Sequence, residues 1–155
     1  EPEARPPEPQ PKQPEPTPDL PDDPAIRLAD WLLDQPELAV TALASGGDAT
    51  GQNAAGDVLW SEDEQRGYMM LRGLQPNDPG VEQYQLWIFD SSRDERFPVD
   101  GGVFDVPTGQ ADVVVPIDAA LAVDRPSLFA ITVEESGGVV VSDRSRIALL
   151  GTVRL

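Results

Sequence analysis

Residues 84–90, Tyr-Gln-Leu-Trp-Ile-Phe-Asp, constrain the fold most, because five of these seven side chains are apolar or aromatic and no Gly or Pro interrupts them. The run is too short for a free-standing helix and rich in residues that suit a pleated, packed surface. Alternation along a strand predicts two faces, which are Tyr84, Leu86 and Ile88 on one side and Gln85, Trp87 and Phe89 on the other. Both faces carry apolar residues, so we expect a central core strand that is covered on both sides.

Strand-like alternation recurs from Leu38 onward, and turn signals such as Asn77-Asp78-Pro79-Gly80 and Gly137-Gly138 separate the runs. The expected strands are 38–44, 57–60, 65–72, 84–90, 102–106, 111–117, 128–133, 139–141 and 146–153. Eight or nine short strands with almost no helix predict an all-β fold, a mainly antiparallel β-sandwich.

Residues 1–24 have the composition of a linker, because ten of the 24 are Pro and Leu20 is the only large apolar side chain. Such a segment buries too little apolar surface to offset its ordering entropy, so we expect a disordered, polyproline-like spacer. A PxxP spacing from Pro11 to Pro14 leaves open a role as a ligand for a proline-binding domain, although this spacing is expected by chance at such a density of Pro.

One short helix is expected after the linker, with Asp23 as its N-cap, Pro24 in its first position and Pro36 ending it. Its expected apolar face comprises Ile26, Leu28, Ala29, Leu32 and Leu33. We interpret this helix as a lid or the end of a stalk. The predicted domains are a Pro-rich disordered linker over 1–24, a short helix and connector over 25–37, and a β-sandwich over 38–155.

The net charge of −17 argues against nucleic acid and anionic membrane surfaces as partners. No apolar run approaches the roughly 20 residues that span a bilayer, and no signal peptide is visible. The first residue is Glu rather than Met. We therefore expect a processed or excised chain, which is either soluble or separated from its membrane segment.

No residue is predicted to be catalytic, to bind a cofactor or to ligate a metal. The chain has no His and no Cys, which excludes Cys/His zinc sites, thiol catalysis and Ser-His-Asp triads. Glu134 and Glu135 are adjacent, so on a strand they point to opposite faces and share no acid–base site. Asp90, Asp94 and Asp100 match no Ca²⁺-binding loop, and a solvated acidic surface is favoured over weak Ca²⁺ binding.

The remaining polar candidates also have structural interpretations. Ser91 and Ser92 lack a His partner, and Arg93 and Arg96 are expected to form surface ion pairs of little energy. Aromatic and Met side chains on strands belong to cores more often than to binding faces, and the residues open to both interpretations are Trp60, Tyr68, Met69 and Met70.

Several stretches together resemble the C-terminal domain of the anti-sigma-K factor family, in order and spacing, over roughly residues 56–153. They are Gly67-Tyr68-Met69-Met70-Leu71-Arg72-Gly73-Leu74, Tyr84-Gln85-Leu86-Trp87-Ile88-Phe89-Asp90, Val99-Asp100-Gly101-Gly102-Val103-Phe104, Phe129-Ala130-Ile131-Thr132-Val133-Glu134 with Gly137-Gly138, and Ala148-Leu149-Leu150-Gly151-Thr152-Val153.

The resemblance implies the regulatory or sensory domain of a membrane-anchored anti-sigma factor. In that family a cytoplasmic part holds an extracytoplasmic-function sigma factor, one transmembrane helix follows, and this domain lies on the extracytoplasmic (periplasmic) face of the bacterial membrane. Stepwise proteolysis, begun by a site-1-type protease, releases the sigma factor. The sigma-binding part and the membrane helix are absent here, so the sigma factor and the membrane are expected as partners only through those absent regions.

Two hypotheses therefore stand. The first is this non-enzymatic anti-sigma domain, in which docking of the short helix through Leu28 and Leu32 protects a cleavable junction around residues 20–38. The second is a secreted or cell-surface β-sandwich that binds a carbohydrate or protein ligand and is carried on a Pro-rich stalk. An upstream membrane helix in the parent gene would favour the first, and an upstream signal peptide or catalytic domain would favour the second.

The absence of His and Cys predicts that the purified protein holds no stoichiometric zinc or copper. Elemental analysis after dialysis without a chelator measures this. One equivalent of either metal would contradict the prediction.

Overall fold

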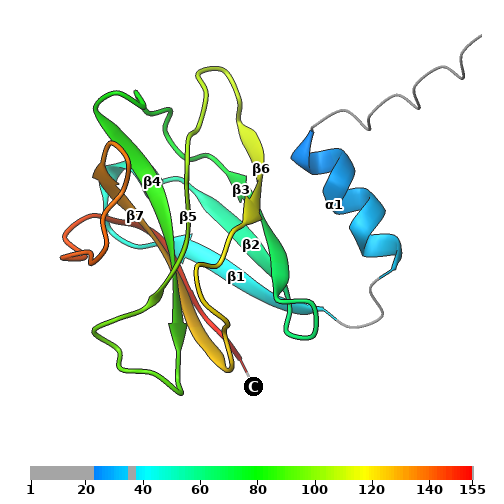
Figure 1. Cartoon of the computed structure of the whole chain (residues 1–155). Coiled ribbons are helices and arrows are strands. Elements are labelled where there is room, and N and C mark those ends of the chain that lie inside the picture. Colours follow the sequence, from blue (N-terminus) through cyan, green and yellow to red (C-terminus); the bar gives the residue numbers. More distant parts are fainter. Residues whose placement is uncertain (1–22, 35–37, 155) are drawn as a thin grey trace, which may run out of the picture.

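The computed structural model describes residues 23–34 and 38–154, which form one α-helix, one short 3₁₀ turn and eight β-strands (Figure 1). The elements are α1 (Pro24–Leu33), β1 (Ala39–Ser45), η1 (Ala49–Gly51), β2 (Ala55–Ser61), β3 (Arg66–Arg72), β4 (Glu82–Asp90), β5 (Val99–Phe104), β6 (Asp112–Ile117), β7 (Pro126–Glu135) and β8 (Ile147–Thr152). The predicted all-β fold with one short helix is confirmed.

The strands form one strongly curled antiparallel sheet in the order β5-β4-β7-β8-β1-β2-β3-β6. β1 joins its two halves, because its first five residues pair with β2 and its last two pair with β8. The two outer edges meet where the N–H groups of Asp118 and Ala120 donate to the carbonyls of Gly101 and Asp100, at 3.0 and 2.9 Å. The sandwich is therefore nearly closed into a barrel around one apolar core.

β4 is an interior strand between β5 and β7, as predicted. Tyr84, Leu86 and Ile88 lie in the main core with at most 1% of their surface exposed. On the opposite face Trp87 is 1% exposed, and its Nε1 donates to Thr132 Oγ1 of β7 at 2.9 Å. The prediction that both faces of this strand are covered is confirmed.

The predicted strand over 139–141 is wrong, because these residues form an irregular loop and Val140 is 93% exposed. The reason is a side chain that takes the place of a neighbouring strand. The buried Gln85 accepts from the Val139 N–H at 2.9 Å through Oε1 and donates to the Val139 carbonyl at 3.0 Å through Nε2. The loop thus satisfies the polar groups of Val139 without sheet pairing.

α1 begins as predicted, since the Asp23 carboxylate accepts from the Ala25 N–H at 3.0 Å and Pro24 is the first helical residue. The predicted apolar face is only partly right. The buried helix residues are Leu28 and Trp31, whereas Leu33 is 84% exposed. Leu28 and the bulky Trp31 are three positions apart and therefore share the covered face of the helix, whereas the Leu-rich end of the helix contributes little to it.

Two sequence-based predictions lie outside the described residues. Residues 1–22 of the Pro-rich linker predicted over 1–24 lie there, and so does the predicted Pro36 stop, within 35–37. Both stay predictions, as do the boundaries between linker, helix and sandwich.

Replacing Trp87 by Ala should lower the free energy of unfolding by about 3–5 kcal/mol, the usual cost of deleting a large buried aromatic side chain. Urea titration monitored by circular dichroism measures this loss. As a control, Phe97→Ala removes an aromatic ring that is 57% exposed and should change stability by less than about 0.5 kcal/mol. A loss below about 1 kcal/mol for Trp87→Ala would contradict the burial of this ring.

Candidate functional site

The first candidate feature is the docking of α1 on the outer face of the sheet, beside β6 (Figure 1). Leu28 and Trp31 pack against Leu59 of β2 and Tyr68 of β3, and all four are buried. This cluster is separate from the main core and joins the helix to the sheet. The apolar part of the helix attachment is therefore small.

Polar contacts fix the rotation of Trp31 in this interface. Its Nε1 donates to Glu64 Oε2 at 2.7 Å, and its ring lies 5.3 Å from that of Tyr68. The Arg66 guanidinium lies within 6 Å of both ring centroids and donates to the Tyr68 hydroxyl at 2.9 Å. Such cation–π contacts contribute about 0.5–1 kcal/mol at partly exposed sites.

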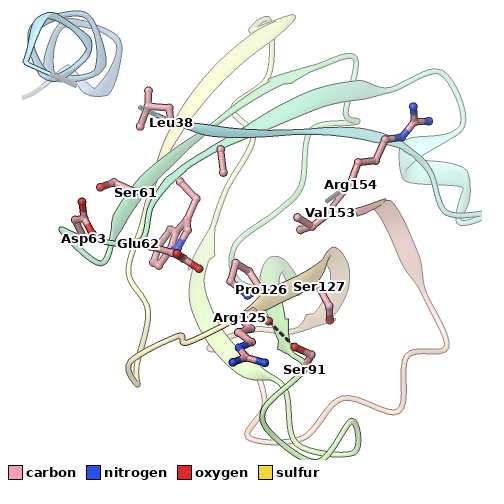
Figure 2. Close-up of a pocket in the computed structure, with 12 residues that line it drawn as sticks. Leu38, Ser61, Glu62, Asp63, Ser91, Arg125, Pro126, Ser127, Val153 and Arg154 are labelled. Atoms are coloured by element: carbon pink, nitrogen blue, oxygen red, sulfur yellow. Dashed lines mark hydrogen bonds between the residues drawn. The ribbon is translucent and has the colours of Figure 1, made fainter. Parts of the chain in front are cut away.

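The second candidate feature is an open cleft of about 680 Å³ at one end of the barrel. Figure 2 shows Glu62 and Asp63, in the β2–β3 turn, on one side and Ser91 and Arg125 on the other. Leu38, just before β1, lies at the upper rim of the cleft in this view. The volume falls in the range typical of small-molecule sites.

The two walls of the cleft are tied together by Gln65, which follows the turn that carries Glu62 and Asp63. Its Nε2 donates to the Val123 carbonyl at 2.8 Å, and its Oε1 accepts from the Val123 N–H at 2.7 Å. Gln65 adopts a φ of +53°, a left-handed conformation that is uncommon outside Gly. The two hydrogen bonds offset that backbone strain and hold the acidic wall in place.

A buried carboxylate organises the opposite wall. Asp90, at the end of β4, has a side chain with no exposed surface and accepts from the N–H groups of Ser92, Asp124 and Arg125 at 2.9, 2.8 and 3.1 Å. The Ser92 hydroxyl donates a fourth bond at 2.7 Å. The backbone of Arg125 is therefore fixed, while its side chain stays free to project from the wall.

Three donors at this cleft have no acceptor in the described part of the chain. The guanidinium groups of Arg125 and Arg154 form no ion pair or hydrogen bond, whereas every other described arginine has a partner. Trp60 lines the cleft and is 1% exposed, and its Nε1 has no acceptor. An unpaired buried donor costs about 1–3 kcal/mol, so such groups are rare.

The carboxylates singled out in the sequence do not gather into a common site. Asp94 pairs with Arg96 at 2.7 Å, and the Asp100 side chain accepts from the Gly102 N–H at 2.8 Å. Glu134 accepts from Thr132 Oγ1 at 2.8 Å and from the Ser142 hydroxyl, whereas Glu135 is exposed. Among residues 23–34 and 38–154, no three acidic side chains form a group that could hold a metal ion.

The other polar candidates have structural roles. The hydroxyls of Ser91 and Ser92 donate to the Arg125 carbonyl and the Asp90 carboxylate. Arg96 forms the expected surface ion pair, but Arg93 lies 3.8 Å from a carboxylate that is fully buried.

The aromatic and Met candidates are mostly core. Trp60 and Met69 belong to the main core, Tyr68 lies under α1, and Met70 is 39% exposed.

The sequence did not single out Trp31, Gln65 or Arg125. A Trp one turn after Leu28 is a detectable signal for a docked helix face. No local signal marks Gln65 or Arg125, because their importance depends on contacts with residues 58 and 35 positions away.

Asp90 should make folding stability depend on pH. Burial by itself would raise its pKa, but the bonds from the Ser92 hydroxyl and from three backbone N–H groups outweigh burial and lower the pKa from 3.8 to about 2. The stabilisation is therefore complete above about pH 4 and is lost as the pH falls through 2, and it amounts to about 2 kcal/mol.

Urea midpoints measured at intervals from pH 6 to pH 2 for the Asp90→Asn and Asp63→Asn variants test this pH dependence. Asp63→Asn is the control, because it alters an exposed carboxylate without a partner. Asp90→Asn should be the less stable variant at pH 6, and the difference should shrink toward pH 2. A difference that stays constant over this range would contradict the assignment.

Comparison with known proteins gives one family. The family described as "Anti-sigma-K factor rskA, C-terminal" matches residues 13–143. This match begins before the resemblance noted from residue 56 and ends before the stretch 148–153. Neither the curated proteins nor the solved structures contain a match to the chain. No helix among the described residues is both long and apolar enough to cross a membrane.

The match covers most of the chain, including α1, the strands β1 to β7, Gln65, Asp90 and Arg125. It supports a regulatory role, because the family consists of anti-sigma factors. The chain belongs to the family of anti-sigma-K factor C-terminal domains.

Proposed function

We propose that this chain is the extracytoplasmic regulatory domain of a membrane-anchored anti-sigma factor that controls an extracytoplasmic-function sigma factor through regulated proteolysis. The observation that carries the proposal is the family match over residues 13–143. The sigma factor and the membrane are contacted by other parts of the protein, and a site-1-type protease on the periplasmic side is the partner that acts on the tether.

The docked helix supplies a physical basis for control by proteolysis. α1 lies between the Pro-rich residues and the barrel, so it belongs to the tether that connects the domain to the rest of the protein. A helix of 10 residues is marginal in water by itself. Leaving the sheet and unfolding are therefore coupled, and the undocked segment becomes an extended protease substrate.

The energy of docking is in the range that a signal can overcome. Burying Leu28 and Trp31 contributes about 1.5–3 kcal/mol for each side chain, and part of this offsets the ordering of the helix. The net preference for the docked state is then a few kcal/mol. A ligand or partner that favours one state by a similar amount changes the exposed population by a large factor.

Cleavage in cells should depend on the covered face of α1. Because the structure buries Trp31 and leaves Leu32 40% exposed, the test pair is Leu28→Asp with Trp31→Asp, which replaces the sequence-based choice of Leu28 and Leu32. In full-length protein this pair should raise cleavage of the tether and sigma-dependent reporter output at least about tenfold, because the open population grows tenfold for each 1.4 kcal/mol of docking lost.

Leu33→Asp is the control, since it adds an aspartate to the same helix at a position that is 84% exposed. It should leave both cleavage and reporter output unchanged. Hydrogen exchange of residues 24–33 in the purified domain reports docking independently. Fast exchange in the double variant without a rise in cleavage or reporter output would rule out this gate.

A further inference from the structure

The cleft at the end of the barrel holds unpaired donors together with unpaired acceptors. The donors are Arg125 on one wall and the buried Trp60 in the lining, and the side chains of Glu62 and Asp63, across the cleft from Arg125, have no hydrogen-bond or ion-pair partner in the described residues. Acids outnumber bases 28 to 11 in this chain, so an arginine without an acidic partner is unexpected. Arg125 nevertheless projects from a backbone that Asp90 holds in place.

The pattern of charge narrows the ligand class. The unpaired Arg125 guanidinium suits a carboxylate, because it can donate two parallel hydrogen bonds and a carboxylate accepts two in one plane. The carboxylates of Glu62 and Asp63 would repel a polyanion such as a nucleotide, but they would accept N–H groups of a ligand. Leu38, Pro126 and Val153 add an apolar surface between the polar walls.

We propose that this cleft binds a short peptide through its free terminal carboxylate, with Arg125 as the anchor for the carboxylate and Glu62 and Asp63 as acceptors for the amine or amide N–H groups. Trp60 also lines the cleft, and its Nε1 is buried without an acceptor. A ligand oxygen that displaces the atoms covering Nε1 gives this donor the acceptor that it lacks. Arg154 extends away from Arg125 at the rim and contributes positive charge without a defined contact (Figure 2).

This site can be tested separately from the proposed role in proteolysis. It requires only the cleft of the folded domain, and its test uses the purified chain without a protease, a membrane or a sigma factor. Failure of the helix-gate experiment would leave the binding prediction intact, and failure of binding would leave the gate intact.

The indole N–H groups provide a direct readout. The chain has three Trp residues, and the Nε1 groups of Trp31 and Trp87 already donate to Glu64 and Thr132. Titration of the ¹⁵N-labelled chain with the tripeptide Ala-Ala-Val up to about 20 mM should therefore produce a saturable shift of the Trp60 indole signal, in the affinity range of a small ligand with one charged anchor. Trp60→Phe identifies that signal by its loss.

Three arms test the proposed contacts. The C-terminal amide of the same peptide should bind at least about tenfold more weakly, because it lacks the carboxylate, and Arg125→Gln should weaken the free peptide by a similar factor. Arg96→Gln is the matched control, since Arg96 is an exposed arginine outside the cleft, and it should bind like the unaltered chain.

An N-acetylated peptide distinguishes the two sources of such a carboxylate. Binding within about threefold of the free peptide supports the C-terminus of a protein as the ligand, and a larger loss supports a free zwitterionic peptide. No saturable shift at Trp60, or equal binding of acid and amide, would overturn the proposal. An unchanged affinity in a folded Arg125→Gln variant would overturn it as well.

Discussion

The fold depends on covering the second face of β4. One face of this strand points into the barrel, where burial of Leu86 and Ile88 requires no special device. The other face carries Gln85 and Trp87 and has no second sheet above it. Trp87 is nevertheless 1% exposed, and a loop that packs near such a face needs its own polar groups satisfied. The structure meets this requirement with hydrogen bonds between side chains and loop backbone.

The same device recurs at three places. Gln85 pairs with both backbone groups of Val139, Gln65 pairs with both of Val123, and Asp90 accepts from three backbone N–H groups. In each case one side chain forms hydrogen bonds with the loop backbone, as a neighbouring strand would in a sheet. Bonds to a buried charged group are worth about 1.5–3 kcal/mol, which explains why the loop that carries Arg125 can be rigid while its side chains stay available.

These bonds also mark the limit of what the sequence could predict. The strands were predictable from alternation and turn residues, and β4 was predictable in detail down to which side chains share a face. The strand expected at 139–141 failed because three consecutive Val residues favour a strand by propensity, whereas the partner that decides their conformation is Gln85, 54 positions away. The helix was located by its N-cap and Pro, but its docked face required knowing that Tyr68 and Leu59 lie beneath Trp31.

The cleft was not predictable for the same reason. The local sequence around Glu62 and Asp63 is that of an ordinary exposed turn, and the sequence around Arg125 is that of an ordinary surface arginine before a Pro. They have a common chemistry only because they face each other across one open end of the barrel, in a cleft whose lining also holds the Trp60 donor. Composition argued only against Cys/His metal sites and His- or Cys-dependent catalysis, because the chain has no His and no Cys. A recognition site built from common residues leaves no such trace in composition.

The two candidate features share one residue. Leu38 lines the cleft and also packs against the cluster that holds α1 to the sheet. It directly precedes β1 and follows the helix segment after residues 35–37, so it connects the tether to the barrel. A ligand that moves Leu38 on entering the cleft changes the packing of Trp31 and Tyr68, and thermodynamic linkage then requires helix docking and ligand binding to alter each other's equilibrium constants by the same factor.

The size of this coupling is bounded by the free energy that Leu38 contributes to the cleft and to the helix cluster. For one partly buried Leu that is about 1–2 kcal/mol, enough to change the undocked population roughly tenfold but not enough to open the gate completely. A graded response, in which ligand adjusts the rate of cleavage without acting as an absolute switch, is therefore what this geometry favours.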